Sequence, residues 1–223
     1  GTGILLRELK EKYKHVKFTG LDPNQSGFHR YEKISKNNLK LDNSLEIKKT
    51  SIENFNNNDK YNLIFSFNVF EHVENQDKYI LKTMSLLKND GMNVIFAPNY
   101  DFPYEPHFLI PIIFNKNITE KIFQRKIQNH EKRTGEEGLW QALQFTGKRK
   151  IKRYLKNNNL NFTFERNISQ KILNRVTNDK IFSKRQGLAA KLAIIGKKFF
   201  LDKLIFDFLK IPFPYFKLII KKK

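Results

Sequence analysis

Apolar residues in the first half of the chain alternate between the spacing of a helix and that of a strand. Residues 4–13 predict an amphipathic helix packed on a sheet, because apolar side chains recur at intervals of three and four among charged ones. Short strands are expected over 16–21 and 45–49, and the first of them ends at the turn Asp22-Pro23-Asn24. A weakly helical segment is expected over 28–40.

The most apolar segment of this half is YNLIFSFNVF, residues 61–70. Such a nearly continuous run is typical of a strand buried on both faces of a parallel sheet. A helix over 77–88 and a strand over 93–97 follow after short connections. The sequence therefore predicts an α/β, Rossmann-like fold: a mostly parallel sheet with helices on both faces and right-handed crossovers.

The pattern changes after residue 110. Helices are expected over 116–130 and 138–157, and strands over 160–165 and 215–223. Segment 186–210 is very apolar but carries charges too often to span a membrane. We therefore expect a core over 1–110 and a basic, mainly helical region over 111–223 that completes the sheet with its last strands.

Charge is distributed unevenly between these two regions. The net charge of the chain is +20, of which the first 110 residues contribute +1 and the rest +19. Such asymmetry indicates an anionic partner, either nucleic acid, a membrane surface or a phosphorylated substrate, or else a solvated lysine-rich surface. The chain has no cysteine, which excludes disulfides and thiolate metal sites and fits a reducing cytoplasm.

Two glycines precede the first helix, at positions 1 and 3. A glycine turn after a strand lets backbone approach a ligand, and an acidic residue about 20 positions later can bind ribose hydroxyls. Asp22 lies at that distance, at the end of the next expected strand. The glycine turn and Asp22 together indicate a nucleoside-containing cofactor. The alternatives are an ordinary turn for the glycines and an ordinary helix or turn cap for Asp22. A dinucleotide is disfavoured because Leu6 stands where its third glycine would be.

Five segments within the first hundred residues together resemble the class I S-adenosylmethionine-dependent methyltransferases. They keep the order and spacing of that family: GTG at 1–3, GLD at 20–22, YNLIFSFNVFEHVEN at 61–75, LLKNDG at 86–91 and VIFAPNY at 94–100. Family members normally carry a strand and another glycine before this point. The resemblance therefore implies an N-terminally truncated chain without its first strand, which we expect to be poorly stable and inactive as it stands.

The resemblance also implies S-adenosylmethionine as cofactor and a set of residues around it. The glycine turn would approach the methionine part, Asp22 would hold the ribose, the residues near position 51 would line the adenine, and the end of the apolar strand would lie beside them. Ser51 departs from the Asp that the family often has there. The implied cofactor-binding residues are Gly1, Thr2, Gly3, Asp22, Ser51, Ile52 and Asn68.

Two histidines are candidate catalytic bases, His72 and His107. An imidazole is suited to accept the proton of an acceptor hydroxyl because its ordinary pKa, about 6.5, is close to neutral pH. Glu71 and His72 match a pair that is common in the family and varies in role. A structural hydrogen bond at the start of a helix is the alternative for His72.

The segment PNYDFPYEPHF, residues 98–108, is rich in proline and aromatic residues and follows an expected strand. A rigid aromatic loop at the carboxyl edge of a sheet suits substrate binding, and a packed connection is the alternative. A metal site of His, Glu and Asp residues in this loop is a further alternative, but no ligand spacing indicates one and none is predicted. The candidate substrate-binding residues are Asn99, Tyr100, Tyr104 and Glu105.

We expect methyl transfer from S-adenosylmethionine to an oxygen of a small-molecule, glycan or lipid-linked acceptor. An RNA methyltransferase and a non-catalytic binding protein on the same scaffold are the alternatives. Nucleic acid is the less favoured partner, because the Asn/Asp-Pro-Pro-aromatic motif of amino-methylating DNA enzymes is absent at 68–70. An anionic membrane surface is a possible partner. The expected location is the cytoplasm, including the inner face of the membrane.

Overall fold

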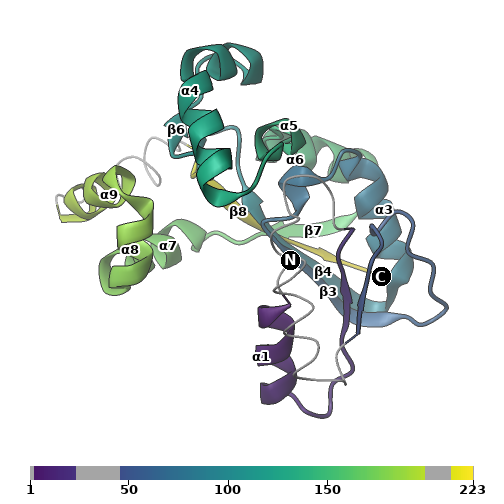
Figure 1. Ribbon diagram of the computed structural model, residues 1–223. Coiled ribbons are helices and arrows are strands. Elements are labelled where there is room, and N and C mark those ends of the chain that lie inside the picture. The colour runs from purple at the N-terminus through teal and green to yellow at the C-terminus, as the bar shows by residue number, and fades with distance from the viewer. Residues whose placement is uncertain (1–2, 24–45, 199–211, 223) are drawn as a thin grey trace. The chain divides into compact units, whose positions relative to one another are not determined.

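The computed structural model describes residues 3–23, 46–198 and 212–222 and divides into two compact units (Figure 1). Unit 1 consists of residues 1–59, 74–86 and 124–143, and unit 2 consists of residues 60–73, 87–123 and 144–223. Gly1 and Thr2, the helix expected over 28–40 and the whole of the segment 199–210 lie outside the described residues.

Unit 1 contains a parallel pair of strands, β1 (Thr19–Leu21) and β2 (Glu46–Lys48), which follow helix α1 (Ile4–Lys12). Helix α3 (Gln76–Leu86), part of α4 (Lys116–Thr134) and α5 (Leu139–Ala142) complete the unit. The most deeply buried apolar side chains of this unit come mainly from these helices: Phe55, Tyr79, Ile80, Leu86, Ile127, Leu139, Trp140 and Leu143.

Helix α1 forms where its periodicity predicts a helix, but it is less buried than expected. None of its residues is fully buried, and Ile4 and Leu5 are exposed. The helix therefore gains only part of the roughly 1.5–3 kcal/mol that full burial of each large apolar side chain provides.

Unit 2 is built on a four-stranded sheet with the order β3-β4-β8-β7 (Figure 1). Strand β3 (Tyr61–Phe67) is parallel to β4 (Leu87–Pro98), whereas β8 (Tyr215–Lys221) runs antiparallel to both β4 and β7 (Asn161–Phe164). Strand β8 alternates between buried and half-buried residues, as expected for a central strand. The buried side chains of this strand are Phe216, Leu218 and Ile220.

Strand β3 is less buried than its composition predicts. Leu63 and Phe67 are each 50% exposed, and among the described residues β3 pairs only with β4. The interpretation of 61–70 as a strand buried on both faces is therefore wrong for this structure. Side chains of a strand point to the two faces of its sheet, so the exposed Leu63 and Phe67 show that the faces of β3 are only partly covered by the described residues.

The rest of unit 2 consists of short strands and helices. Tyr104–Glu105 (β5) pairs with Ile110–Pro111 (β6), and Phe70–His72 forms the 3-10 helix η1. Helix α4 has a kink at Phe123, where the two units also divide. The C-terminal helices are α6 (Lys148–Asn157), α7 (Ile168–Asn178), α8 (Lys180–Gln186) and α9 (Leu188–Lys198).

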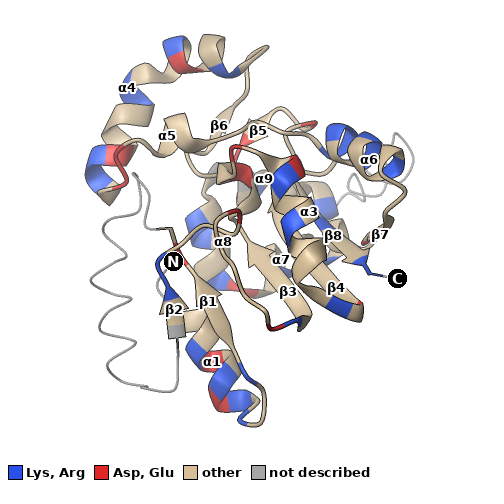
Figure 2. Ribbon diagram, turned by 90° about the vertical axis from the view of Figure 1, so that its right-hand side faces the viewer, with Lys and Arg blue, Asp and Glu red and all other residues tan. Residues whose placement is uncertain are grey.

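Helix α6 shows how the basic region can be charged and still pack. It carries six Lys and Arg residues, which Figure 2 shows along the helix. Its two buried residues, Ile151 and Leu155, are four positions apart and therefore lie on one face. The lysine-rich segment 148–157 thus folds as an amphipathic helix.

The α/β fold class expected from the sequence is confirmed, with two differences in detail. Strands 16–21 and 61–67, expected in one sheet, belong to separate sheets of two and four strands. The helix expected over 138–157 is divided into α5 and α6, since residues 143–147 are not helical.

Candidate functional site

Unit 2 contains a cluster of contacting polar side chains, Glu71, His72, Tyr100, Glu105 and His107, which together with the aromatic rings around it is called the polar centre. Glu71 lies in the short helix η1 that follows strand β3. Its side chain is 1% exposed, and among the described residues neither carboxylate oxygen has a hydrogen-bond partner. Burial raises the pKa of Glu71 to about 7, because a charged carboxylate loses its hydration there. A buried acidic group without hydrogen bonds is costly to a fold and points to a functional role.

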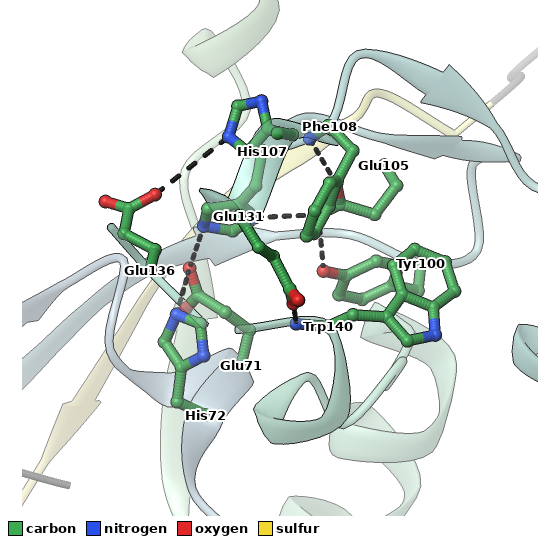
Figure 3. Close-up of polar contacts among 10 residues, drawn as sticks. Glu71, His72, Tyr100, Glu105, His107, Phe108, Glu131, Glu136 and Trp140 are labelled. Atoms are coloured by element: carbon green, nitrogen blue, oxygen red, sulfur yellow. Dashed lines mark hydrogen bonds and ion pairs between the residues drawn. The ribbon is translucent and has the colours of Figure 1, made fainter. Parts of the chain in front are cut away.

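Two imidazoles face this carboxylate, as Figure 3 shows. The Nε2 atom of His107 lies 3.6 Å from Glu71 Oε1, and the Nε2 atom of His72 lies 3.9 Å from the same oxygen. The two rings meet edge to face, with centroids 5.5 Å apart. The structure therefore brings together the two histidines that the sequence nominated, although 35 positions separate them in the chain.

The two histidines differ in electrostatic environment. Burial, together with the charge of His107, lowers the pKa of His72 to about 3. The ring of His72 therefore stays neutral near neutral pH and is a weak proton acceptor. His107 is better placed as a base, because it also contacts a second carboxylate.

That second carboxylate is Glu105 in strand β5, which is fully buried. Its Oε1 atom lies 2.7 Å from Nδ1 of His107 and also accepts a hydrogen bond from the Tyr100 hydroxyl at 3.2 Å. Its Oε2 atom accepts a hydrogen bond from the Phe108 backbone N–H at 2.8 Å. Glu105 is thus held at both oxygens, and it orients His107 so that Nε2 points toward Glu71 (Figure 3).

Aromatic side chains surround Glu105. The ring of Tyr100 stacks on Phe145 with centroids 4.5 Å apart, which fixes its hydroxyl toward the carboxylate. Burial and the charge of Glu105 raise the pKa values of Tyr100, Tyr104 and Tyr215. These hydroxyls therefore remain protonated and available as hydrogen-bond donors at neutral pH.

Asn99, a candidate substrate ligand, is engaged in the fold. Its side-chain amide donates to the Phe213 carbonyl at 2.9 Å, and its Oδ1 atom accepts hydrogen bonds from the backbone N–H groups of Asp101 and Lys148. The Asp101 carboxylate accepts a further bond from the Arg149 N–H at 2.8 Å. These two side chains bind backbone N–H groups of the first turn of α6, so the loop 98–108 is attached to the basic region.

A glycine makes this attachment possible. A Cβ atom at Gly147 would lie 2.1 Å from Oδ1 of Asp101 and 3.0 Å from its backbone nitrogen. We expect Gly147→Ala to destabilise the protein by about 1–3 kcal/mol, because the carboxylate must move and release the helix end. Urea unfolding measures this change.

A double-mutant cycle tests the cause. Because the clash is with the Asp101 carboxylate, Gly147→Ala combined with Asp101→Ala should cost clearly less than the sum of the two single changes. Strictly additive changes in the free energy of unfolding would contradict the explanation.

The residues expected at the cofactor lie mostly in unit 1. Gly3 has φ of 75° at the start of α1, and a Cβ atom there would lie 2.9 Å from Cδ1 of Ile47. Ile47 is the partner of Gly20 in the β1–β2 pair, and Asp22 follows directly after β1, where its N–H donates to the Lys48 carbonyl. The glycine bend and the carboxyl end of β1 are thus linked through one strand, β2.

The other cofactor candidates divide between the units. Ser51 and Ile52 follow β2 in unit 1 and are partly buried. Asn68 follows β3 in unit 2 with φ of 51°, and its N–H donates to the Phe96 carbonyl at 2.9 Å. Positive φ in a residue other than glycine is uncommon and is often found at functional sites.

Three members of the polar centre were not nominated as site residues from the sequence: Glu71, Phe145 and Tyr215. Glu71 did carry a signal, since a charged residue directly after a very apolar strand requires a partner or a function. Phe145 and Tyr215 lie far from the loop in sequence, and only the tertiary structure brings them to it.

Comparison with known protein families finds a match for the N-terminal part of the chain. Residues 1–93 match the family model described as a methyltransferase domain. Two uncharacterized proteins of Mycobacterium tuberculosis are each 29% identical to the chain over 188 residues, which is 83% of this chain and 64% of theirs. The chain thus spans less than two thirds of the length of these relatives.

Solved structures with a similar fold are methyltransferases. The plantazolicin methyltransferase BpumL, in complex with a triazolic desmethylPZN analogue and S-adenosylhomocysteine, superposes with a TM-score of 0.54 at 16% identity, covering 100% of this chain and 74% of its own. Phosphoethanolamine N-methyltransferase 2 of Haemonchus contortus gives 0.55 at 12% identity, covering 100% and 46%. An O-methyltransferase from a polyketide synthase of Brevibacillus brevis gives 0.52 at 13%, covering 100% and 64%. The family match and the fold confirm the resemblance stated from the sequence.

Proposed function

We propose, from the match of residues 1–93 to the methyltransferase domain family, that the protein transfers the methyl group of S-adenosylmethionine to an acceptor oxygen. The observation that carries the proposal is the left-handed Gly3 bend, linked through β2 to the end of β1 and Asp22. This arrangement suits a ligand with a ribose and a charged sulfur. The complexes of the similar folds with S-adenosylhomocysteine support the same cofactor here.

The cofactor supplies an activated methyl group, so the protein must orient the acceptor and exclude water. In our proposal the Gly3 bend approaches the methionine part, Asp22 accepts hydrogen bonds from the ribose, and Ser51 and Ile52 line the adenine. Asn68, which follows β3 in unit 2, is the further residue that the resemblance assigns to the cofactor. Gly1 and Thr2, expected in the same turn, lie outside the described residues.

The acceptor proton is removed by the polar centre of unit 2. Bound S-adenosylmethionine would supply the methyl group, and Nε2 of His107 would accept the proton of the acceptor hydroxyl. The imidazolium that forms is stabilised by Glu105 at Nδ1 and by Glu71 at Nε2. His72 helps to position the pair and stays neutral, since burial lowers its pKa to about 3.

We propose a small-molecule, glycan or lipid-linked acceptor. Partly buried Tyr100 and Tyr104 near Glu105 support an acceptor with hydroxyl groups and a flat or ring-shaped body. Titration of the full-length protein with S-adenosylmethionine by calorimetry tests the cofactor. Transfer of a labelled methyl group to a panel of phenols, glycans and prenylated quinols then tests the acceptor class.

The same measurements separate the alternatives. A non-catalytic binding protein would bind the cofactor or an acceptor without transferring label to any of them. An RNA methyltransferase would transfer label to RNA and to no small molecule in the panel.

The C-terminal helices support an acceptor at a lipid surface. Ile181 in α8 and Leu192 in α9 are each 70% exposed, and Lys184 and Arg185 are close to Ile181 in sequence. Exposed apolar residues among lysine and arginine suit an anionic membrane surface. Among the described residues, no helix is both long enough and apolar enough to cross a membrane.

We expect the double change Ile181→Glu and Leu192→Glu to lower partitioning onto anionic liposomes at least about tenfold, because it removes two apolar contacts and adds repulsion. Flotation measures the bound fraction. Phe114→Ser is the matched control, since Phe114 is 92% exposed but lies before α4. Binding to RNA in a filter assay, without binding to liposomes, would remove the membrane proposal.

A further inference from the structure

We propose that Glu71, His72 and His107 bind one divalent transition-metal ion. Each residue offers one ligand atom, and these three atoms lie within 4.8 Å of one another. All three residues belong to unit 2: Glu71 and His72 come from η1, and His107 comes from the connection between β5 and β6. The ligand atoms therefore converge within a single compact unit.

The distances are close to those that a bound ion requires. A tetrahedral ion with ligands at about 2.1 Å holds neighbouring ligand atoms about 3.4 Å apart. Oε1 of Glu71 lies 3.6 Å from Nε2 of His107 and 3.9 Å from Nε2 of His72. All three ligand atoms lie within 4.8 Å of one another, so they are near the spacing that one ion requires.

The burial of Glu71 supports a cation between the three side chains. Both carboxylate oxygens are buried, and among the described residues neither has a hydrogen-bond partner. A carboxylate in this setting is stabilised when it coordinates a metal, which replaces the lost hydration with a direct ionic contact. The direction of the Glu71 side chain, toward the two Nε2 atoms in Figure 3, fits this role.

An outer partner orients one of the imidazole ligands. Nδ1 of His107 lies 2.7 Å from Oε1 of Glu105, which leaves Nε2 facing Glu71. Metal-binding histidines commonly hold a carboxylate in this way through their second nitrogen, which fixes the tautomer and the ring. Tyr100 and the Phe108 N–H in turn hold Glu105.

The ligand types indicate the class of ion. Two imidazoles and one carboxylate suit Zn²⁺ and neighbouring transition ions, and a site with three protein ligands leaves a position open for water or substrate. Mg²⁺ prefers oxygen ligands and is disfavoured. In the metal-bound protein His107 acts as a ligand, so the ion would replace it as the group that activates the acceptor hydroxyl.

Metal binding can be measured without cofactor or acceptor, so its outcome is independent of methyl transfer. Untagged full-length protein is treated with chelator, desalted and titrated with Zn²⁺ against a coloured competing chelator. We expect one tight site per chain. Glu71→Gln should weaken its affinity at least about 100-fold, since loss of an outer partner alone costs about 10- to 100-fold.

Matched variants serve as controls. Glu165→Gln removes another carboxylate of unit 2, one that pairs with Lys217 at 2.6 Å, and should leave Zn²⁺ affinity unchanged. Glu105→Gln should weaken Zn²⁺ binding by about 10- to 100-fold through the orientation of His107. Far-ultraviolet circular dichroism of each variant confirms that it is folded.

Co²⁺ gives a second measurement on the unmodified protein. Visible absorption bands of a four-coordinate Co²⁺ site are expected at one equivalent, should be lost in His107→Ala, and should persist in His15→Ala, a change at an exposed histidine. Zn²⁺ should displace Co²⁺, and millimolar Mg²⁺ should not. The proposal is overturned if no site fills at one equivalent, if folded Glu71→Gln binds Zn²⁺ as tightly as the unmodified protein, or if Mg²⁺ displaces Co²⁺.

Discussion

In protein without a bound metal ion, His107→Ala is expected to lower the rate of methyl transfer to a hydroxyl acceptor by about 100- to 10,000-fold, the usual contribution of a general base. The reason is the position of His107, whose Nδ1 is held by Glu105 and whose Nε2 faces Glu71. The loss should appear in kcat, because proton removal occurs in the transfer step. Steady-state kinetics with labelled S-adenosylmethionine measures it.

The acidity of the acceptor provides the control. A phenol that is already ionised at the assay pH needs no base, so the same variant should methylate it with little loss relative to the unmodified enzyme. A variant that loses activity equally with ionised and un-ionised phenols would contradict the role of a base. Equal activity of His107→Ala and unmodified enzyme with a weakly acidic alcohol would contradict any role of His107 in the reaction.

Asp22→Ala is expected to weaken binding of S-adenosylmethionine by about 10- to 100-fold. A hydrogen bond to a charged group contributes about 1.5–3 kcal/mol, and each 1.4 kcal/mol changes a dissociation constant tenfold. The position of Asp22 at the end of β1, linked through Ile47 to the Gly3 bend, is the structural reason. Calorimetric titration of the full-length protein gives the dissociation constant.

Asp59→Ala is the matched control for this change. Asp59 belongs to the same unit and forms only an exposed ion pair with Lys17, at 3.2 Å, so its loss should leave cofactor affinity unchanged. If the two variants bound S-adenosylmethionine equally well, the ribose contact proposed for Asp22 would be wrong.

Periodicity predicted most of the regular structure. The apolar spacing located α1, β3, β4 and β8 because each has a face or a full length rich in apolar residues. The pairing of β8 with β4 could not be read from the sequence alone, since 116 residues separate the two strands. Long-range pairing depends on the whole fold, whereas periodicity is a local property.

The site was predicted only in part, because residue type is a local property whereas contacts between distant segments depend on the whole fold. Residue type identified His72 and His107, and the structure brings both to one carboxylate. The supporting roles of Glu71 and Phe145 depend on burial and stacking, which arise only when distant segments pack. Asn99 was nominated for substrate because it lies in the loop 98–108, but in the fold its side chain holds the first turn of α6.

Among the described residues, strand β3 has one strand partner, β4, which has a consequence for behaviour in solution. The other edge of such a strand presents a row of backbone N–H and C=O groups, and here Leu63 and Phe67 are half-exposed beside them. Such a row is a template on which a further extended segment can add, from the same or another molecule. Natural proteins normally protect this kind of edge with charges, proline or a bulge. Residues 62–67 carry no charge and no proline, and the pairing of β3 with β4 has a register shift between Tyr61 and Leu63. We therefore expect this edge to favour self-association at high protein concentration.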